Sequence, residues 1–179
     1  MRLFHFSHDG DITLFKPRPV ETPSTRKPGM DWLNGPLVWA IDEWHQPLYL
    51  FPRECPRILV WKVEGSTAHD WDAWSDCSSA RMMAFIEQDW ARAVREGAIF
   101  RYELPERGFQ PIGDAGMWVS KEPAKPVGVD LIDDLPAALI AEQIELRIVD
   151  DLQALSPVWS STLHASGIRL RNARSRTSV

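Results

Sequence analysis

The residues of this chain that could do chemistry begin with a histidine and a serine near the N-terminus. His5 and Ser7 alternate with Phe4 and Phe6 in a short aromatic-rich segment, residues 2–7, that is typical of a strand. Because successive side chains of a strand point to opposite faces, we expect Phe4 and Phe6 to face the core. His5 and Ser7 would then share the other face, where His5 either hydrogen-bonds a ligand in a cleft or is satisfied by backbone groups.

Two arginines flank a cysteine in a stiff corner between two prolines. Arg53 and Arg57 lie on either side of Cys55. A guanidinium can donate a bidentate pair of hydrogen bonds, which suits a phosphate or a carboxylate. The same charges could lower the pKa of the Cys55 thiol and activate it. The alternative is a structural corner in which the arginines pair with nearby acids such as Glu54.

Glu103 is a carboxylate in a second predicted strand, residues 98–104, on the same face as Arg101. The two residues form either a surface ion pair, worth under about 1 kcal/mol, or part of a cleft. In a cleft, Glu103 could hold a ribose hydroxyl or stabilise a developing cation. Trp39 and Trp44 follow a long proline-bearing loop, residues 16–36. Their rings can stack on a planar ligand or pack in the core.

The pattern of histidines and acids does not predict a metal site. His5 and His8 are three residues apart, and on a strand they would point to opposite faces. We expect the polar cluster of residues 69–76 to cap and solvate the start of a helix. The sequence also lacks both common glycine-rich phosphate loops.

Composition narrows the class of protein. The chain has 179 residues, 44% hydrophobic and 25% charged, which fits one globular domain over residues 1–179. Its net charge of −5 makes nucleic acid an unlikely partner class. No stretch has the length of a membrane span or a signal-peptide core. We therefore expect a cytoplasmic protein in which Cys55 and Cys77 are free thiols.

Strands and helices alternate without a βαβ rhythm, which favours an α+β fold with a mixed or antiparallel sheet. The expected strands span residues 2–7, 37–41, 58–63, 98–104, 117–120, 127–131 and 144–149. A long helix is expected over residues 79–96, because Met82, Ile86, Trp90 and Val94 recur every four residues. C-terminal helices are expected over residues 134–143 and 151–163. They precede a basic tail, residues 165–179, that either docks on the acidic body or stays disordered.

Three stretches resemble a small bacterial family of unknown function: Leu3-Phe4-His5-Phe6-Ser7, residues 34–57 (NGPLVWAIDEWHQPLYLFPRECPR) and Ile168-Arg169-Leu170-Arg171-Asn172-Ala173. A second resemblance is to ADP-ribosyltransferase-like folds of the small rifampin-modifying type. In that type, a first strand bears a ligand-binding histidine followed by a small polar residue, similar to His5-Phe6-Ser7. Its Tyr-Arg-Ser-x-Glu-Pro segment resembles residues 118–123, which include Ser120, and the strand before that segment resembles residues 100–105.

The second resemblance implies a domain that binds NAD or a related nucleotide. His5 would hold the nicotinamide-side ribose or the carboxamide, and Arg53 or Arg57 would bind the pyrophosphate. Glu103 would hydrogen-bond the ribose 2′-hydroxyl and stabilise an oxocarbenium-like transition state. The remaining cofactor-binding residues would be Ser7, Trp39 and Ser120.

Two other hypotheses remain open at this point. One is a non-catalytic module that binds a protein partner through exposed tryptophans and the arginine-rich tail. The other is a thiol-dependent hydrolase, which requires a depressed pKa at Cys55. Whether the chain is an enzyme is not decided by its sequence.

Overall fold

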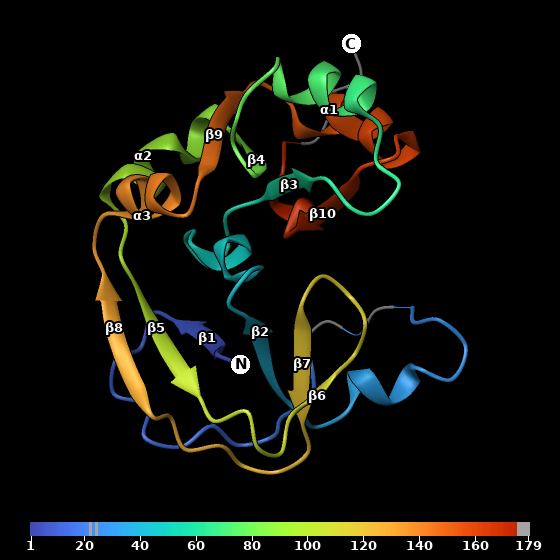
Figure 1. Ribbon diagram of the computed structural model, residues 1–179. Helices are drawn as coiled ribbons and strands as arrows, with labels where there is room; N and C mark the ends of the chain where they lie inside the picture. The colour runs from blue at the N-terminus through green and yellow to red at the C-terminus, as the bar shows by residue number, and fades with distance from the viewer. Residues whose placement is uncertain (22, 24, 175–179) are drawn as a thin grey trace. The chain divides into compact units, whose positions relative to one another are not determined.

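The computed structural model describes residues 1–21, 23 and 25–174, and the chain divides into two compact units (Figure 1). The first unit comprises Met1–Gln46 and Ile99–Ile132, and the second comprises Pro47–Ala98 and Asp133–Val179. Each unit has its own sheet and its own hydrophobic cluster. The α+β class is confirmed, while the expectation of one domain stays a prediction.

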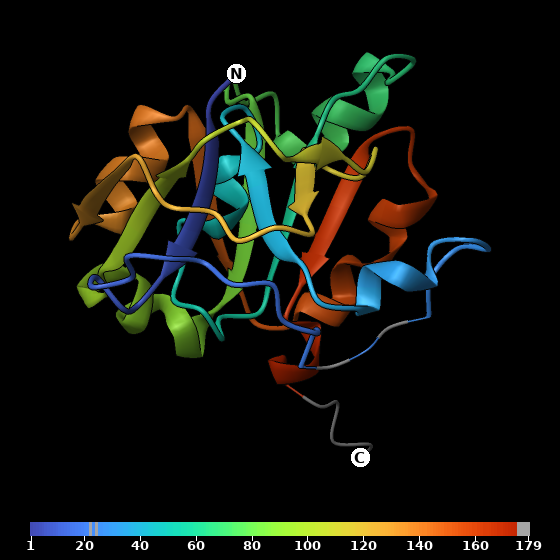
Figure 2. The same cartoon turned by 90° about the horizontal axis from the view of Figure 1, so that it is seen from below.

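The first unit is built on a six-stranded sheet in which every neighbouring pair is antiparallel, in the order β6-β7-β2-β1-β5-β8. Figure 2 shows β1 between β2 and β5. The strands are β1 (Leu3–Ser7), β2 (Val38–Asp42), β5 (Ile99–Leu104), β6 (Gln110–Pro111), β7 (Met117–Ser120) and β8 (Gly128–Ile132). A short 3-10 helix, η1 (Asp31–Asn34), precedes β2.

The two faces of this sheet follow from its register. Residues directly opposite each other on antiparallel strands point to the same face. His5 is opposite Tyr102, whereas Phe4 is opposite Glu103 and Phe6 is opposite Arg101. We call these two sides the Tyr102 face and the Arg101 face.

A hydrophobic cluster covers the Tyr102 face, where Phe15 and Ala124 pair across it in an isolated bridge. Its buried members are Leu3, Phe15, Val38, Ala40, Tyr102, Leu104 and Ala124. The prediction that His5 and Ser7 would lie on the face away from the core is therefore wrong. Phe4 is buried as well, on the Arg101 face. Alternation fixed which residues share a face, but both faces carry buried apolar groups, so it could not identify the core side.

The second unit is built on a four-stranded sheet in the order β10-β3-β4-β9, in which only the β4–β9 pair is parallel. The strands are β3 (Arg57–Trp61), β4 (Met82–Glu87), β9 (Ile144–Val149) and β10 (His164–Ile168). Its helical segments are α1 (Ala68–Ser75), η3 (Gln88–Trp90), α2 (Ala91–Glu96), α3 (Leu135–Ala141), η4 (Leu152–Ser160) and η5 (Leu170–Asn172), and η2 (Gln46–Tyr49) begins at the last residue of the first unit's N-terminal segment.

The long helix predicted over residues 79–96 is wrong. Residues 82–87 form β4, every one of them buried, and only the last six residues of that range form the helix α2. β4 pairs with β3 on one side and with β9 on the other, so it takes a continuous apolar run on both faces. A four-residue apolar period inside such a run cannot be distinguished from a helix stripe.

The polar cluster of residues 69–76 does not start that helix either. It forms a helix of its own, α1, whose N-cap is Thr67. The Thr67 hydroxyl accepts a hydrogen bond from the backbone N–H of Asp70, at 3.1 Å. Asp76 ends α1 in the left-handed conformation. The acids therefore lie within and after this helix.

The first residues of the basic tail belong to a strand, which the positive charge of this region did not predict. Residues 164–168 form β10, an edge strand that pairs antiparallel with β3. Beyond it, Arg169 and Arg171 form ion pairs with Glu54, and Arg174 pairs with Asp89. Docking is thus confirmed as far as residue 174, and residues 175–179 of the predicted tail lie outside the described residues. The predicted helix over residues 151–163 is the 3-10 segment η4, which contains Pro157.

Candidate functional site

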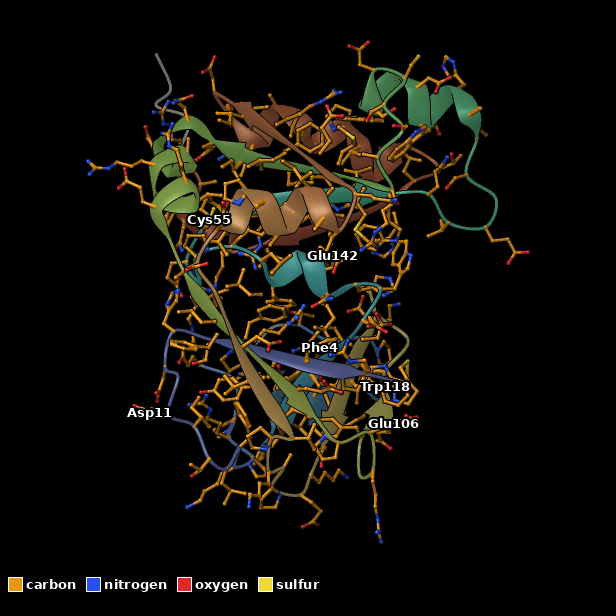
Figure 3. The ribbon with its side chains drawn as sticks, turned by 60° about the vertical axis from the view of Figure 1, so that its left-hand side comes forward. Phe4, Asp11, Cys55, Glu106, Trp118 and Glu142 are labelled. Atoms are coloured by element: carbon orange, nitrogen blue, oxygen red, sulfur yellow. The ribbon has the colours of Figure 1, made fainter. Side chains whose placement is uncertain are left out.

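Charged side chains gather on the Arg101 face of the six-stranded sheet, around Phe4 on β1. Figure 3 labels Phe4 there. The guanidinium carbons of Arg2 and Arg101 lie 4.9 Å and 5.0 Å from the centroid of the Phe4 ring. Cation–π contacts of this kind contribute about 0.5–1 kcal/mol where they are exposed. Phe4 therefore fixes two cations on one side of the sheet.

Each of these arginines also holds a carboxylate. Arg2 donates to Glu103 at 2.8 Å and to Glu43 at 3.0 Å. Arg101 donates to Asp130 at 3.0 Å and to the side-chain oxygen of Gln46, also at 3.0 Å. We call these residues, Arg2, Glu43, Gln46, Arg101, Glu103 and Asp130, the Arg2–Arg101 cluster. It brings together Arg2, which immediately precedes β1, with groups from β5, β8 and the turn that follows β2.

Glu103 is the member of the cluster best suited to bind a ligand hydroxyl. The hydrogen bond and charge of Arg2 lower the pKa of its carboxyl, and the modest burial of the group opposes that effect. Its side chain remains 32% exposed. Only one carboxylate oxygen has a hydrogen-bond partner among the described residues. Glu103 is therefore ionised at neutral pH and has an oxygen available as an acceptor.

The turn after β2 carries a carboxylate–imidazole pair, Asp42 and His45. One Asp42 oxygen accepts the backbone N–H of His45 at 2.8 Å and contacts its ring Nδ1 at 2.9 Å. Burial raises the pKa of Asp42, but the hydrogen bonds from His45 outweigh it, and the net shift is downward. Gly116 packs against this pair with a positive φ of 71°. A Cβ added there would lie 2.2 Å from the imidazole Nδ1.

His5 points away from the Arg2–Arg101 cluster, on the Tyr102 face. Its Nδ1 lies 2.8 Å from the backbone oxygen of Trp39, and its ring packs at 4.6 Å on Phe15. Because a carbonyl can only accept, Nδ1 carries the proton in this contact. The His5 side chain thus links β1 to β2 beyond the last backbone pair of these strands, Phe4 and Ile41. His5 and Glu103 do not share a face.

Ser7 and Ser120 both make local hydrogen bonds. The Ser7 hydroxyl accepts the N–H of Asp9 at 3.1 Å. The Ser120 hydroxyl both donates to the carbonyl of Glu122 and accepts its N–H, each at 3.0 Å. Both serines are buried. Turn stabilisation accounts for these contacts.

Trp39 lies on the same face as Glu103, since it is two residues from Ile41, which is paired with Phe4. Its indole N–H is buried and has no hydrogen-bond partner in the described part of the chain. The Nε–H of Arg101, on the same face, also lacks one there. Buried donors are nearly always satisfied in folded proteins, so these two donors are available to hydrogen-bond a ligand on this face.

The predicted pyrophosphate site lies in the second unit, where its two arginines differ sharply. Arg53 is 45% exposed, and its Nε lies 4.0 Å from a carboxylate oxygen of Glu54. Arg57 is only 1% exposed and donates to the carbonyls of Leu48 at 2.7 Å and Cys55 at 2.8 Å. Burial lowers the pKa of the Arg57 guanidinium to about 10. Arg57 is therefore charged at neutral pH but enclosed.

Of the two interpretations of the Cys55 corner, the structure favours the structural one over an activated thiol. Burial raises its pKa to about 12, an effect that the nearby Arg57 charge only partly offsets. A nucleophilic thiol needs the opposite shift. The flanking arginine does not activate Cys55 because the thiol is excluded from water, which disfavours the thiolate.

Sequence reasoning identified Glu103 and Trp39 on this face but missed Arg2, Gln46 and the Asp42–His45 pair. A signal for the last was present: a buried strand followed by acid and histidine three residues apart. Arg2 and Gln46 carry no such signal, because their roles depend on contacts across 101 and 55 residues of sequence.

Among residues 1–21, 23 and 25–174, no group of three or more His, Cys, Asp or Glu side chains could hold a metal ion. Within the same part of the chain, no helix is long and apolar enough to cross a membrane.

Comparison with known proteins identifies one family. The family described as "Family of unknown function (DUF6886)" matches residues 4–173, and the chain belongs to it. No curated protein and no solved structure matches the chain.

Proposed function

We propose that this member of the DUF6886 family binds a nucleotide, with NAD as the leading ligand, on the Arg101 face of its six-stranded sheet. The observation that carries the proposal is Glu103, an ionised and partly exposed carboxylate that Arg2 holds in place. A carboxylate in this state is a strong acceptor for the hydroxyls of a ribose. Trp39 and Arg101 support the proposal, because each offers an unused N–H donor on the same face.

The reaction that we propose is ADP-ribosyl transfer, which the sequence resemblance implies. In that reaction the bond between the ribose C1′ and the nicotinamide nitrogen breaks, and nicotinamide leaves with the electron pair. An acceptor nucleophile then bonds to C1′ and gives up its proton. Glu103 would hydrogen-bond the 2′-hydroxyl, and its negative charge would stabilise the oxocarbenium-like transition state.

Other residues take positioning roles in this proposal. Arg2 keeps Glu103 ionised and oriented, while His5 holds the strands on which the face is built. The assignment of Arg53 to a pyrophosphate stays a separate prediction for the second unit, where its side chain is 45% exposed. Arg57, being enclosed, is assigned to the framework.

The proposal is tested by titrating intrinsic tryptophan fluorescence with NAD, beside an ATP control. We expect saturable quenching by NAD and a roughly tenfold weaker affinity in Glu103→Gln, the cost of one charge-assisted hydrogen bond. The matched control is Glu96→Gln, since Glu96 is also an exposed carboxylate that pairs with an arginine, Arg92. A flat titration up to millimolar NAD, or equal affinity of both variants and wild type, would overturn the proposal.

A second candidate function is binding of a protein partner through exposed aromatic groups. Trp44 and Trp159 are 44% and 48% exposed, far more than a core tryptophan. The tail arginines support this alternative less well, because those at positions 169, 171 and 174 already pair with acids of the second unit. If NAD has no effect, a Trp159→Ala variant that loses a captured partner would favour this function.

A further inference from the structure

The strand β8 ends the six-stranded sheet and leaves one of its edges without a partner among the described residues. Residues 128–131 of this strand are all exposed. Val129 and Leu131 are 48% and 54% exposed, and Val127, just before the strand, is 66% exposed. An apolar strand at an open edge readily pairs with another strand, and soluble proteins usually protect such edges.

The hydrogen-bond pattern shows which backbone groups of β8 point outward. The Glu103 carbonyl accepts the N–H of Val127 at 2.9 Å, so residue 103 directs its backbone groups toward β8. Gly128 is opposite Glu103, and Asp130 is opposite Arg101. The backbone groups of Gly128 and Asp130 therefore point inward to β5. By alternation, those of Val129 and Leu131 point out of the sheet.

We propose that β8 pairs with β8 of a second copy of this chain, antiparallel and about a two-fold axis at Val129. This register places Val129 opposite its own counterpart as a hydrogen-bonded pair, and the N–H and C=O of each satisfy those of the other. It also brings Val127 of one copy toward Leu131 of the other. The apolar residues of the edge thus cover one another.

The charged residues of β8 favour this register over the adjacent one, in which the two-fold axis would pass through Asp130. Centred on Val129, it places Asp130 of one copy opposite Gly128 of the other. An added Cβ at Gly128 would meet nothing within 4 Å, so there is room for the aspartate. Centring the axis on Asp130 would instead set two aspartates directly opposite each other, which is destabilising. Just outside the strand, the favoured register brings Lys125 toward Asp133 of the second copy.

The pairing has an isologous, closed geometry, because the same strand serves both copies. The strand has only five residues, so the contact area is small and the dimer is expected to be weak. We expect a dissociation constant on the order of tens of micromolar. This dimer requires neither NAD binding nor any residue of the Arg2–Arg101 cluster other than Asp130.

The test is sedimentation velocity over a range of protein concentrations, with two isosteric variants of one glycine. Gly128→Asp places an acid opposite Asp130 of the second copy, and we expect it to raise the dimer dissociation constant about tenfold or more. Gly128→Asn has the same size without the charge and should dimerise considerably better. Near-ultraviolet circular dichroism checks that both variants are folded.

Cross-linking tests the register directly. In a Cys77→Ser background, Val129→Cys should oxidise to a covalent dimer, because hydrogen-bonded pairs hold their Cα atoms about 5.5 Å apart, within disulfide range. Val127→Cys alone should not, since residue 127 does not face itself. A wild-type protein that remains monomeric at about 500 μM, roughly tenfold above a dissociation constant of tens of micromolar, would overturn the proposal. Equal cross-linking of the two cysteine variants, or equal dimerisation of the two Gly128 variants, would also overturn it.

Discussion

Two arginines on inner strands, one in each unit, have opposite surroundings. Arg101 on β5 is 23% exposed, pairs with Asp130 and has an N–H without a partner in the described chain. Arg57 on β3 is 1% exposed, donates to two backbone carbonyls and forms no ion pair with any described residue. The comparison separates two environments of one side chain: an enclosed arginine that donates to backbone carbonyls supports the fold, while a partly exposed one with an N–H unpaired among the described residues can bind a ligand.

The surroundings of Arg57 explain how a charge can be buried without a carboxylate. Its guanidinium carbon lies 5.1 Å from the centroid of the Phe51 ring and 5.6 Å from that of Tyr49. Aromatic faces and carbonyl oxygens each carry partial negative charge, and together they replace part of the lost hydration. The segment that leads into β3 is therefore folded around this side chain.

The largest expected effect comes from removing the two guanidinium groups in turn. Arg57→Met keeps the length of the side chain but withdraws the donors to the Leu48 and Cys55 carbonyls. We expect the free energy of unfolding to fall by about 2–4 kcal/mol. Arg101→Met should cost less, about 1–2 kcal/mol, because the exposed Asp130 can turn to water whereas Gln46, only 2% exposed, loses a donor. Urea denaturation measures both. Equal decreases in the free energy of unfolding would contradict the conclusion that the two arginines contribute differently to the fold.

A smaller effect is expected from a pair of glycines, again one in each unit. Gly116 and Gly65 both have positive φ, 71° and 88°. An added Cβ at Gly65 meets nothing within 4 Å, whereas at Gly116 it would lie 2.2 Å from a ring nitrogen of His45. Gly65→Ala should cost about 1 kcal/mol from backbone strain alone.

Gly116→Ala should cost about 1–2 kcal/mol more than Gly65→Ala, because overpacking is added to the strain. It should also separate His45 from Asp42, which histidine resonances in an NMR spectrum would report. If both alanine variants have the same thermal unfolding midpoint, Gly116 does not pack against the pair as described.

The smallest effect is a dependence of stability on acid pH, which involves Asp42 in the first unit and Glu54 in the second. Hydrogen bonds from His45 outweigh the burial of Asp42 and lower its pKa, and Asn172 with the nearby arginines lowers that of Glu54. A lowered pKa in the folded state means that each carboxylate stabilises the fold above its ordinary pKa, 3.8 or 4.5. That stabilisation is lost as the pH falls through the lower, folded value.

We expect the thermal midpoint to decrease below pH 4.5 and the decrease to be shallower in Asp42→Asn and in Glu54→Gln. Differential scanning calorimetry between pH 6 and pH 2 measures this. A decrease as steep in both variants as in wild type would assign the acid sensitivity to other carboxylates.

Much of the first unit could be predicted from alternation. The segments Phe4-His5-Phe6 and Arg101-Tyr102-Glu103 alternate as expected, and their register places Phe4 opposite Glu103. The strand over residues 117–120 was also located correctly. The first two segments succeed because each has one side-chain type on each face, which a period of two detects. The candidate site was found only in part, since Glu103 was recognised without Arg2.

The second unit could be predicted only in part: β3, β9 and α3 lie where strands over residues 58–63 and 144–149 and a helix over 134–143 were expected, but β4 and β10 were missed. Met82 to Ile86 is apolar throughout, so it carries no periodic signal that separates a doubly covered strand from a helix. His164 to Ile168 has few strand-forming residues and precedes a run of arginines, so its charge context concealed β10. The strand forms because β3 offers it a partner about a hundred residues earlier in the chain.

The sequence by itself determined which side chains share a face of β1 and β5, the α+β class, and the acidic character of the chain. Tertiary structure alone decided which face is packed, that Arg57 is enclosed while Arg101 is not, and that Cys55 is protected instead of reactive. The physical reason is that alternation is a property of neighbouring residues. Burial, and with it the pKa of a thiol or the freedom of a guanidinium, depends on segments that are distant in sequence.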